Sequence, residues 1–129
     1  MAVIQAFNDG MAKGELRMDL IDPEVDVFDY DIPDAGSYHG HEGVAKWLVE
    51  DWGSAWESYE FEPEELVDAG DVVVSIFTIT PRGKGSGIET RRRNATVNTV
   101  ENGLATRIEY YTTVEEARQA AGLTATAET

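Results

Sequence analysis

Two aspartates near the start of the chain, Asp29 and Asp31, are the best candidates for acid–base chemistry. They end the stretch EVDVFDYD (24–31), whose alternation places them on one face of a strand with Val25 and Val27. A carboxylate in a partly dry pocket is poorly solvated, so it can take a proton from a carbon next to a carbonyl. The alternative is that both are solvated acids in a very acidic protein.

Both histidines of the chain lie in SYHGHEGVAKW (37–47), as His39 and His41. A His-x-His pair can bind a metal, but a site needs a third and usually a fourth ligand. Only acids such as Glu42 or Asp34 are available nearby, and the chain has no cysteine. The sequence therefore predicts no metal site here, and the glycine-containing segment is interpreted as the entrance to a helix.

Two basic segments suggest anion binding. Arg91, Arg92 and Arg93 could bind a carboxylate or phosphate, or they could be the solvated face of a strand. The turn PRGKGSG (81–87) contains glycines and a lysine, but it lacks the GxxxxGK[ST] spacing and joins two strands. We interpret it as a hairpin tip or pocket rim.

The apolar spacing predicts the elements that must position these residues. Residues 2–21 read as two short helices, and a helix from 41 or 42 to the mid-fifties would carry all three tryptophans, Trp47, Trp52 and Trp56. Antiparallel hairpins should follow, with strands over 59–67, from 72, from 88 and up to 112. Thr113 and Glu116 form a capping box for a final helix that ends at Gly122.

This order predicts an α+β fold, an antiparallel sheet with helices gathered on one face. A curved sheet wrapped around helices leaves a concavity in which a small ligand can bind. The length of 129 residues suits one domain. We expect it to span residues 1–123, with 124–129 as a disordered tail.

Composition narrows the class of function. Ten basic against 25 acidic residues give a net charge of −15, which disfavours nucleic acid and anionic membranes as partners. The N-terminal segment resembles neither a secretory signal nor a membrane span, so a cytoplasmic protein is expected.

The segments AFNDG, DPEVDV, YHGHEGVAKW, WESYEFEPEELVDAGDVVV, GKGSGIE, ENGLATRIEYY and EEARQAAGL follow one another in a familiar order. Together they resemble the SnoaL-like branch of the nuclear transport factor 2-like superfamily. The resemblance implies a conical α+β fold, with a strongly curved antiparallel sheet, an enclosed pocket for a small hydrophobic molecule, and a homodimer. Relatives include polyketide cyclases, ketosteroid isomerases and limonene-epoxide hydrolases, so the fold does not select one reaction.

The resemblance to the isomerases implies a base at Asp29 or Asp31, working without a cofactor. Their second acid would fall at Ala95 or Thr96, and neither is acidic. Pairing across the Asn102-Gly103 turn predicts one interior face, which holds Arg93, Ala95, Val97, Ile108, Tyr110 and Thr112. Candidate substrate-binding residues are therefore Arg93 and Tyr110, together with Tyr38, Trp47 and Trp56.

The other relatives fit less well. The cyclases use an aspartate on the last strand and a histidine on its neighbour, but Glu109 is the only acid in RIEYYT (107–112) and 88–100 has no histidine. Asp29 and Arg93 supply two members of an epoxide-hydrolase cluster, and the third is unassigned. Two hypotheses remain: a cofactor-independent isomerase, cyclase or hydrolase of a hydrophobic or polycyclic substrate, or a dimeric ligand-binding module without turnover.

Overall fold

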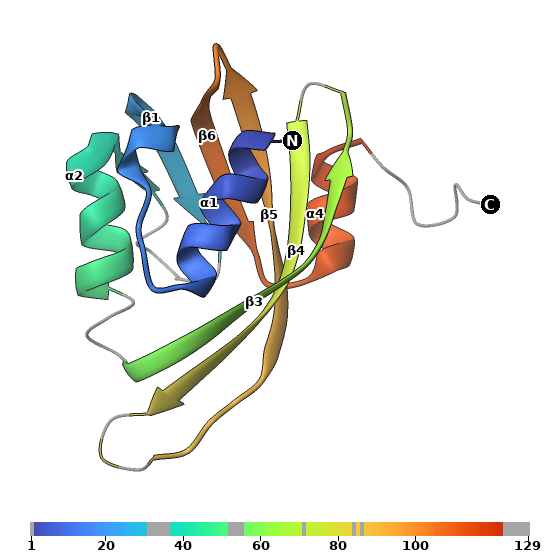
Figure 1. Ribbon diagram of the computed structural model, residues 1–129. Coiled ribbons are helices and arrows are strands. Elements are labelled where there is room, and N and C mark those ends of the chain that lie inside the picture. The colour runs from blue at the N-terminus through green and yellow to red at the C-terminus, as the bar shows by residue number, and fades with distance from the viewer. Residues whose placement is uncertain are drawn as a thin grey trace.

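A curved sheet with helices on both faces forms the body of the molecule (Figure 1). The computed structural model describes residues 2–30, 37–51, 56–70, 72–83, 85 and 87–122. The helical segments are α1 (Ala2–Ala12), the 3₁₀ turn η1 (Met18–Leu20), α2 (Gly40–Ala45), its π-helical continuation η2 (Lys46–Asp51) and α4 (Val114–Ala120). The strands are β1 (Ile21–Asp29), β2 (Ser37–His39), β3 (Trp56–Asp68), β4 (Val72–Gly83), β5 (Arg92–Glu101) and β6 (Leu104–Tyr111).

The strands lie in the order β2-β1-β6-β5-β4-β3 among the described residues. Strands β3 to β6 are consecutive antiparallel neighbours, which confirms the predicted hairpins. The α+β class is confirmed as well. One pair departs from an all-antiparallel sheet, because β1 runs parallel to β6. That pairing joins strands that are far apart in the chain, so no turn sequence between them predicts it.

Each face of the sheet has its own hydrophobic cluster. The helices α1 and α2 pack on the concave face, and α4 packs on the opposite face, which we call the α4 face (Figure 1). The buried concave cluster comprises Ile4, Ile21, Val25, Val27, Tyr38, Val44, Trp47, Val73, Phe77, Ile79, Ala105, Ile108 and Tyr110. The buried cluster on the α4 face comprises Val74, Ile76, Ala95, Val97 and Ala117.

The predicted interior face of the last hairpin is wrong. The turn is where it was expected, with Asn102 and Gly103 at φ of 52° and 78°, as two-residue hairpin turns require. However, a register shift between Thr99 and Val100 displaces the pairing by one residue. A one-residue slip moves every side chain to the other face, so Ile108 pairs with Asn98 and not with Val97.

The tryptophan helix is confirmed through Asp51 but does not carry all three tryptophans. Val44 and Trp47 are buried on one side of α2 and η2, as the spacing predicts. Trp56 instead begins β3, so its assignment to the helix is wrong. Trp52 lies outside the described residues.

The histidine segment is a helix entrance, as predicted. Gly40 begins α2 at φ of 73°, a conformation that side chains with a Cβ rarely adopt, and a Cβ there would lie 3.1 Å from the Pro23 carbonyl oxygen. His41 Nε2 lies 2.8 Å from the Ile21 carbonyl oxygen and donates to it, which ties α2 to β1.

The C-terminal helix begins with the expected cap. The Thr113 hydroxyl accepts from the Glu116 backbone N–H at 3.2 Å, and it contacts the Glu116 carboxylate at 2.9 Å. The cap defines the start of α4, which packs against β5. The expected tail at 124–129 lies outside the described residues. Among the helices that the structure describes, none is both long and apolar enough to cross a membrane.

Candidate functional site

Asp29 is a fully buried carboxylate at the end of β1. Strand β1 alternates as predicted, so Val25, Val27 and Asp29 all face the concave side and none has exposed surface. The indole Nε1 of Trp47 donates to Asp29 Oδ2 at 2.6 Å. A buried charged group needs such partners, so Trp47 both covers and orients this carboxylate.

Asp29 is the first member of a transverse row across the concave face. It pairs with Tyr110 on β6, Tyr110 pairs with Thr96 on β5, and Thr96 pairs with Ser75 on β4. Because neighbouring strands are about 4.8 Å apart, the backbone of Thr96 lies roughly 10 Å from that of Asp29. We call these four residues the polar row.

A narrow cavity of about 50 Å³ lies above the middle of this row, between α1, η2 and the sheet. Its wall is almost entirely apolar and aromatic, which is typical of sites for small hydrophobic molecules. The lining residues are Phe7, Asn8, Met11, Trp47, Leu48, Tyr59, Phe61, Phe77, Ile79, Thr96, Ile108 and Tyr110.

The cavity continues into an open groove of about 540 Å³. Met11, Leu48, Tyr59 and Phe61 line both spaces, so the groove forms the mouth of the cavity. Three acids, Glu15, Glu60 and Glu62, also line the groove. Their charges add to the strongly negative net charge, so the entrance repels anions.

Tyr110 links the row to a buried amide. Its hydroxyl donates to Asn94 Oδ1 at 2.8 Å, and Asn94 Nδ2 donates to the Thr112 carbonyl at 2.7 Å. The rings of Tyr110 and Trp47 pack edge to face, with their centroids 6.1 Å apart. Tyr38 also packs against Trp47, with its ring centroid 6.3 Å away, and it is not part of the cavity lining. Tyr110 and Trp47 thus lie at the cavity, while Tyr38 supports Trp47.

Burial also affects a phenol at the cavity mouth. Tyr59 is half-buried, and desolvation raises the pKa of its hydroxyl above the usual range. Tyr59 therefore stays neutral near pH 7.

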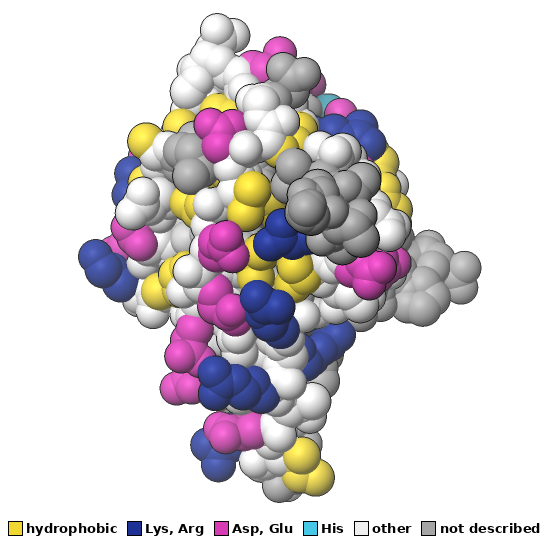
Figure 2. Space-filling model, turned by 90° about the vertical axis from the view of Figure 1, so that its right-hand side faces the viewer, with side chains coloured by type: hydrophobic (Ala, Val, Ile, Leu, Met, Phe, Trp, Pro, Cys, Tyr) yellow, Lys and Arg dark blue, Asp and Glu magenta, His cyan; other side chains and the backbone are white. Residues whose placement is uncertain are grey.

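Arg93 lies away from the cavity. Its side chain is half exposed, and its Nε donates to Glu64 Oε1 at 3.0 Å. The Glu64 carboxylate also accepts from the Thr78 hydroxyl, and these two donors lower its pKa. On the face seen in Figure 2, basic and acidic side chains lie next to one another over the lower part of the molecule, where β3 to β5 extend. Arg93 therefore pairs with Glu64 on the surface of the sheet and does not lie beside Asp29.

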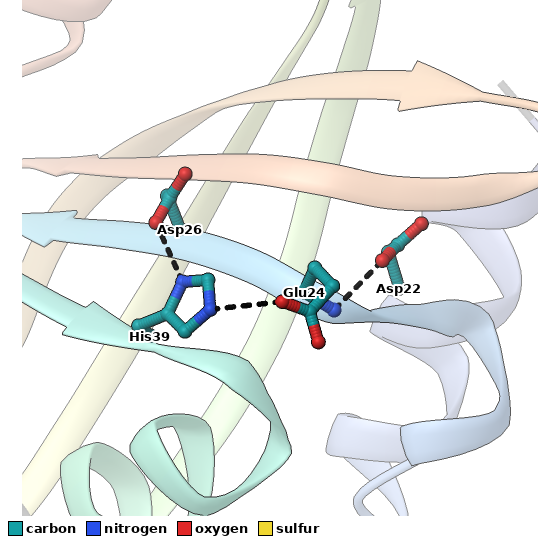
Figure 3. A network of polar contacts seen from close by, with 4 residues as sticks. All are labelled: Asp22, Glu24, Asp26 and His39. Carbon is teal, nitrogen blue, oxygen red and sulfur yellow. Dashed lines mark hydrogen bonds and ion pairs between the residues drawn. The ribbon is translucent and has the colours of Figure 1, made fainter.

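His39 and His41 point to different partners. His39 Nδ1 lies 2.9 Å from Asp26 Oδ1, and its Nε2 lies 3.3 Å from Glu24 Oε1 (Figure 3). The hydrogen bonds to Asp26 and then Glu24 raise the pKa of His39 above its ordinary value. Among the residues that the structure describes, no three His, Cys, Asp or Glu side chains are arranged to hold a metal ion.

Two candidates fall outside the described part of the chain. Asp31 is in the undescribed segment 31–36, and at Trp56 only the backbone is described. Their roles stay predictions.

The family of this chain is shown by comparison of its sequence with models of known protein families. A model of the SnoaL-like domain matches residues 2–108. This chain belongs to the SnoaL-like domain family. A search of curated proteins found no match.

Solved structures with the same fold agree with this assignment. TerC, co-crystallised with polyporic acid, is 19% identical, with a TM-score of 0.75 over 94% of this chain and 96% of that one. A hypothetical protein with a ketosteroid isomerase-like fold from Catenulispora acidiphila, in complex with trimethylamine, is 17% identical, with a TM-score of 0.70 over 94% and 92%. A putative SnoaL-like polyketide cyclase from Mesorhizobium loti is 17% identical, with a TM-score of 0.64 over 85% and 96%. These neighbours are nuclear transport factor 2-like folds, and at such identities they show the fold alone.

Sequence reasoning missed part of the cavity wall of this SnoaL-like chain. Asn8 and Thr96 line the cavity, and Ser75 accepts a hydrogen bond from Asn8, but none of the three is among the residues that the sequence predicts to bind a substrate. The strand NATVNTV (94–100) alternates polar and apolar residues, and the sequence predicts that the apolar set faces the interior. In the structure Ala95 and Val97 face α4, so the polar set faces the cavity. The position of α4 on the opposite face was the missing information.

Proposed function

We propose that this SnoaL-like protein binds a small, mostly apolar molecule in the cavity, and that Asp29 acts on it as a general base without a cofactor. The observation that carries the proposal is the fully buried carboxylate of Asp29, held by Trp47, which is itself a cavity wall. The apolar lining supplies binding energy, and the carboxylate supplies a proton acceptor.

The proposed step is the removal of a proton from a carbon next to a carbonyl. The proton moves to an Asp29 oxygen, the C–H electron pair becomes the C=C bond of the enolate, and the carbonyl oxygen takes the negative charge. Where the substrate carries a C=C bond next to that carbon, the enolate is conjugated with it, and return of the proton to the far end of that C=C bond shifts the double bond and completes an isomerisation. The Trp47 indole keeps the carboxylate oriented while its charge is lost and regained.

The acidic entrance narrows the substrate class. Glu15, Glu60 and Glu62 line the groove through which a ligand enters. Uncharged or cationic molecules are therefore favoured over carboxylates and phosphates. Neighbouring structures hold small organic ligands, polyporic acid in one and trimethylamine in another, which supports small-molecule binding in general.

Exchange of the α-hydrogens of 1-tetralone in D₂O, followed by NMR, tests the proposal. The wild-type protein should accelerate exchange over buffer, and Asp29→Asn should lose roughly 10²–10⁴-fold of that acceleration. The amide oxygen of this variant can still accept from Trp47, so the fold and ligand binding should persist. Asp26→Asn is the matched control, because Asp26 is on the same strand with its side chain exposed, and it should exchange at the wild-type rate.

A second function, ligand binding without turnover, has its own supporting observation. Asp29 has no exposed surface, and the rings of Trp47 and Tyr110 that lie beside it pack edge to face. In that case Asp29 only anchors Trp47. Tetralone binding without accelerated exchange would favour this function, and absence of binding would contradict both.

The family resemblance also suggests a homodimer and a cytoplasmic location. Both stay predictions for this chain.

A further inference from the structure

Residues 37–51 form one continuous unit of β2, α2 and η2, which we call the β2–η2 unit. His39 precedes α2 as its N-cap residue, and Trp47 lies about two turns further along. Tyr38 packs against the Trp47 ring, and Gly43 lies so close to Tyr38 that a Cβ at this glycine would be 3.1 Å from the Tyr38 Cβ. Because its parts contact one another closely, the unit should detach from the sheet as a whole.

Side chains of this unit bind three points along β1. They are His41 at the Ile21 carbonyl, His39 at the Asp26 and Glu24 carboxylates, and Trp47 at the Asp29 carboxylate. The backbone ladder between β1 and β2 has three residue pairs within the described part of the chain, and β2 is the end strand of the described sheet. Because this ladder is short, the attachment of the unit depends in part on these side-chain bonds.

The bonds made by His39 depend on the charge of its ring. Nδ1 lies 2.9 Å from Asp26 Oδ1 and Nε2 lies 3.3 Å from Glu24 Oε1, so each ring nitrogen faces a carboxylate (Figure 3). A protonated imidazole has a hydrogen on both nitrogens and can donate to both carboxylates at once. A neutral ring has one hydrogen, so one of the two carboxylates then faces a nitrogen lone pair. Both bonds therefore form only when His39 is protonated.

The other charged or titratable side chains around His39 have different partners or orientations. On β1, β2 and α2, and at the position of β6 that pairs with Asp26, these side chains are Asp22, Asp29, Tyr38, His41, Glu42 and Arg107. Asp29 and Tyr38 are buried, and His41 is bound to the Ile21 carbonyl. The Arg107 guanidinium lies over the Phe28 ring, 4.4 Å from its centre. Glu42 is exposed.

The acids of β1 favour the protonated form of His39. Asp22 accepts from the Glu24 backbone N–H at 2.7 Å, which adds a third carboxylate to this part of the strand. The hydrogen bonds to Asp26 and then Glu24 raise the pKa of His39 above its ordinary value. The charges around the ring thus agree with the hydrogen-bond geometry.

We propose that His39 makes the attachment of the β2–η2 unit to β1 depend on pH, so that the cavity opens more often when His39 is neutral. Trp47 and Leu48 on η2 line the cavity, so detachment of the unit opens the cavity and removes the indole from Asp29. The stabilising contribution of His39 is complete below the unfolded pKa near 6.5, and it is lost as the pH rises through the raised folded pKa. This inference concerns access to the site and goes beyond the proposed reaction.

NMR hydrogen exchange of the Trp47 indole N–H tests the inference, with its signal assigned by its absence from Trp47→Phe. Protection factors, which correct for intrinsic exchange, are compared for the wild-type protein and His39→Gln at pH 5.5 and pH 8.5. At pH 5.5 the wild-type value should be roughly 1.5- to 5-fold higher, the range that corresponds to one exposed ion pair. At pH 8.5 the two values should be equal, because glutamine and neutral histidine both lack a charge.

Asp19→Asn is the matched control. It removes another exposed ion pair, that of Asp19 with Arg17 at 2.8 Å, which lies outside the β2–η2 unit. The protection factor of the Trp47 indole in this variant should equal the wild-type value at both pH values. The most protected backbone amides of β4 and β5 report global unfolding, and their protection should exceed that of the Trp47 indole.

The outcomes separate this inference from the proposed function. Equal protection of the Trp47 indole in the wild-type protein and His39→Gln at pH 5.5, or an equal loss at both pH values, overturns the pH-dependent attachment. Protection of this indole equal to that of the most protected amides of β4 and β5 would show that the unit opens only on global unfolding, which also overturns it. None of these results changes the tetralone test of Asp29.

Discussion

The two faces of strands β4 and β5 are built from alternate residues of the same segments, yet they differ in kind. On the α4 face, Val74, Ile76, Ala95 and Val97 pack against Ala117, and every member of this buried cluster is aliphatic. On the concave face, the positions between them include Ser75, Asn94, Thr96 and Asn98, all partly or fully buried. The stability of the α4 face therefore depends on close apolar packing, whereas that of the concave face also depends on hydrogen bonds between specific polar groups.

This difference agrees with the proposed binding site on the concave face. Apolar packing maximises stability, whereas buried polar groups cost free energy unless each one is paired. A sheet selected only for stability would have aliphatic residues on both faces. The polar row on the concave side is thus the part of the structure that apolar packing does not explain, and two of its members, Thr96 and Tyr110, line the cavity.

The largest expected effect comes from removing the indole that donates to Asp29. Trp47→Ala should lower the free energy of unfolding by roughly 3–5 kcal/mol, because it opens the core and leaves the buried carboxylate without its indole donor. Ile76→Val, which removes one methyl group from the α4 face, should cost about 0.5–1.5 kcal/mol. Urea unfolding followed by far-UV circular dichroism measures both.

Trp47→Phe separates packing from hydrogen bonding at this site. It keeps an aromatic ring but no N–H donor, so its cost should still exceed that of Ile76→Val. If the two costs were equal, the concave face would depend on volume alone, like the α4 face.

An intermediate effect is expected from two isosteric exchanges at adjacent positions of β5. Val97→Thr buries a hydroxyl on the α4 face, where the side chain is 1% exposed, and it should destabilise by roughly 1–3 kcal/mol. Thr96→Val removes a hydroxyl from the cavity wall and should stay within about 1 kcal/mol of the wild-type stability, because Asn98 keeps its bond to the Val73 carbonyl. Equal losses in the two denaturation curves would remove the distinction between the faces.

The smallest expected effect is that of the exposed pair between His39 on β2 and Asp26 on β1. Asp26 lies on the same strand as Asp29, but its side chain is exposed. Because its partners raise the pKa of His39 in the folded state, protonated His39 stabilises the β1–β2 pairing below the unfolded value near pH 6.5. That contribution is lost as the pH rises through the raised folded pKa.

The melting temperature tests this pH dependence. It should be slightly higher for the wild-type protein than for His39→Gln at pH 5, and equal for the two at pH 9. Salt should reduce the difference, since the pair is exposed. A difference that grows with pH would contradict the assigned direction.

Whether a structural feature can be predicted from the sequence depends on how far apart in the chain the interacting residues are. Local patterns predicted α1, the turn at Asn102, the cap at Thr113 and the inward face of β1 that contains Asp29. Each of these is decided by residues a few positions apart. The family resemblance added the fold class.

Features that depend on distant contacts were not predictable in this way. The parallel pairing of β1 with β6, the register shift at Thr99 and the packing of α4 behind β5 are properties of the assembled sheet. They decide that Thr96 faces the cavity and that Arg93 pairs with Glu64 instead. The sequence did not predict that Asn8 is buried, because a single polar residue on a helix is usually solvated.

The parallel β1–β6 pair has a consequence for the order of folding. Strands β3 to β6 are linked by hairpins and can form early, whereas Asp29 meets Tyr110 only when a loop of about 80 residues closes. We therefore expect the sheet to form before the site exists. The carboxylate stays hydrated until β1 docks on β6, so the step that forms this parallel pair is also the step that buries the acid.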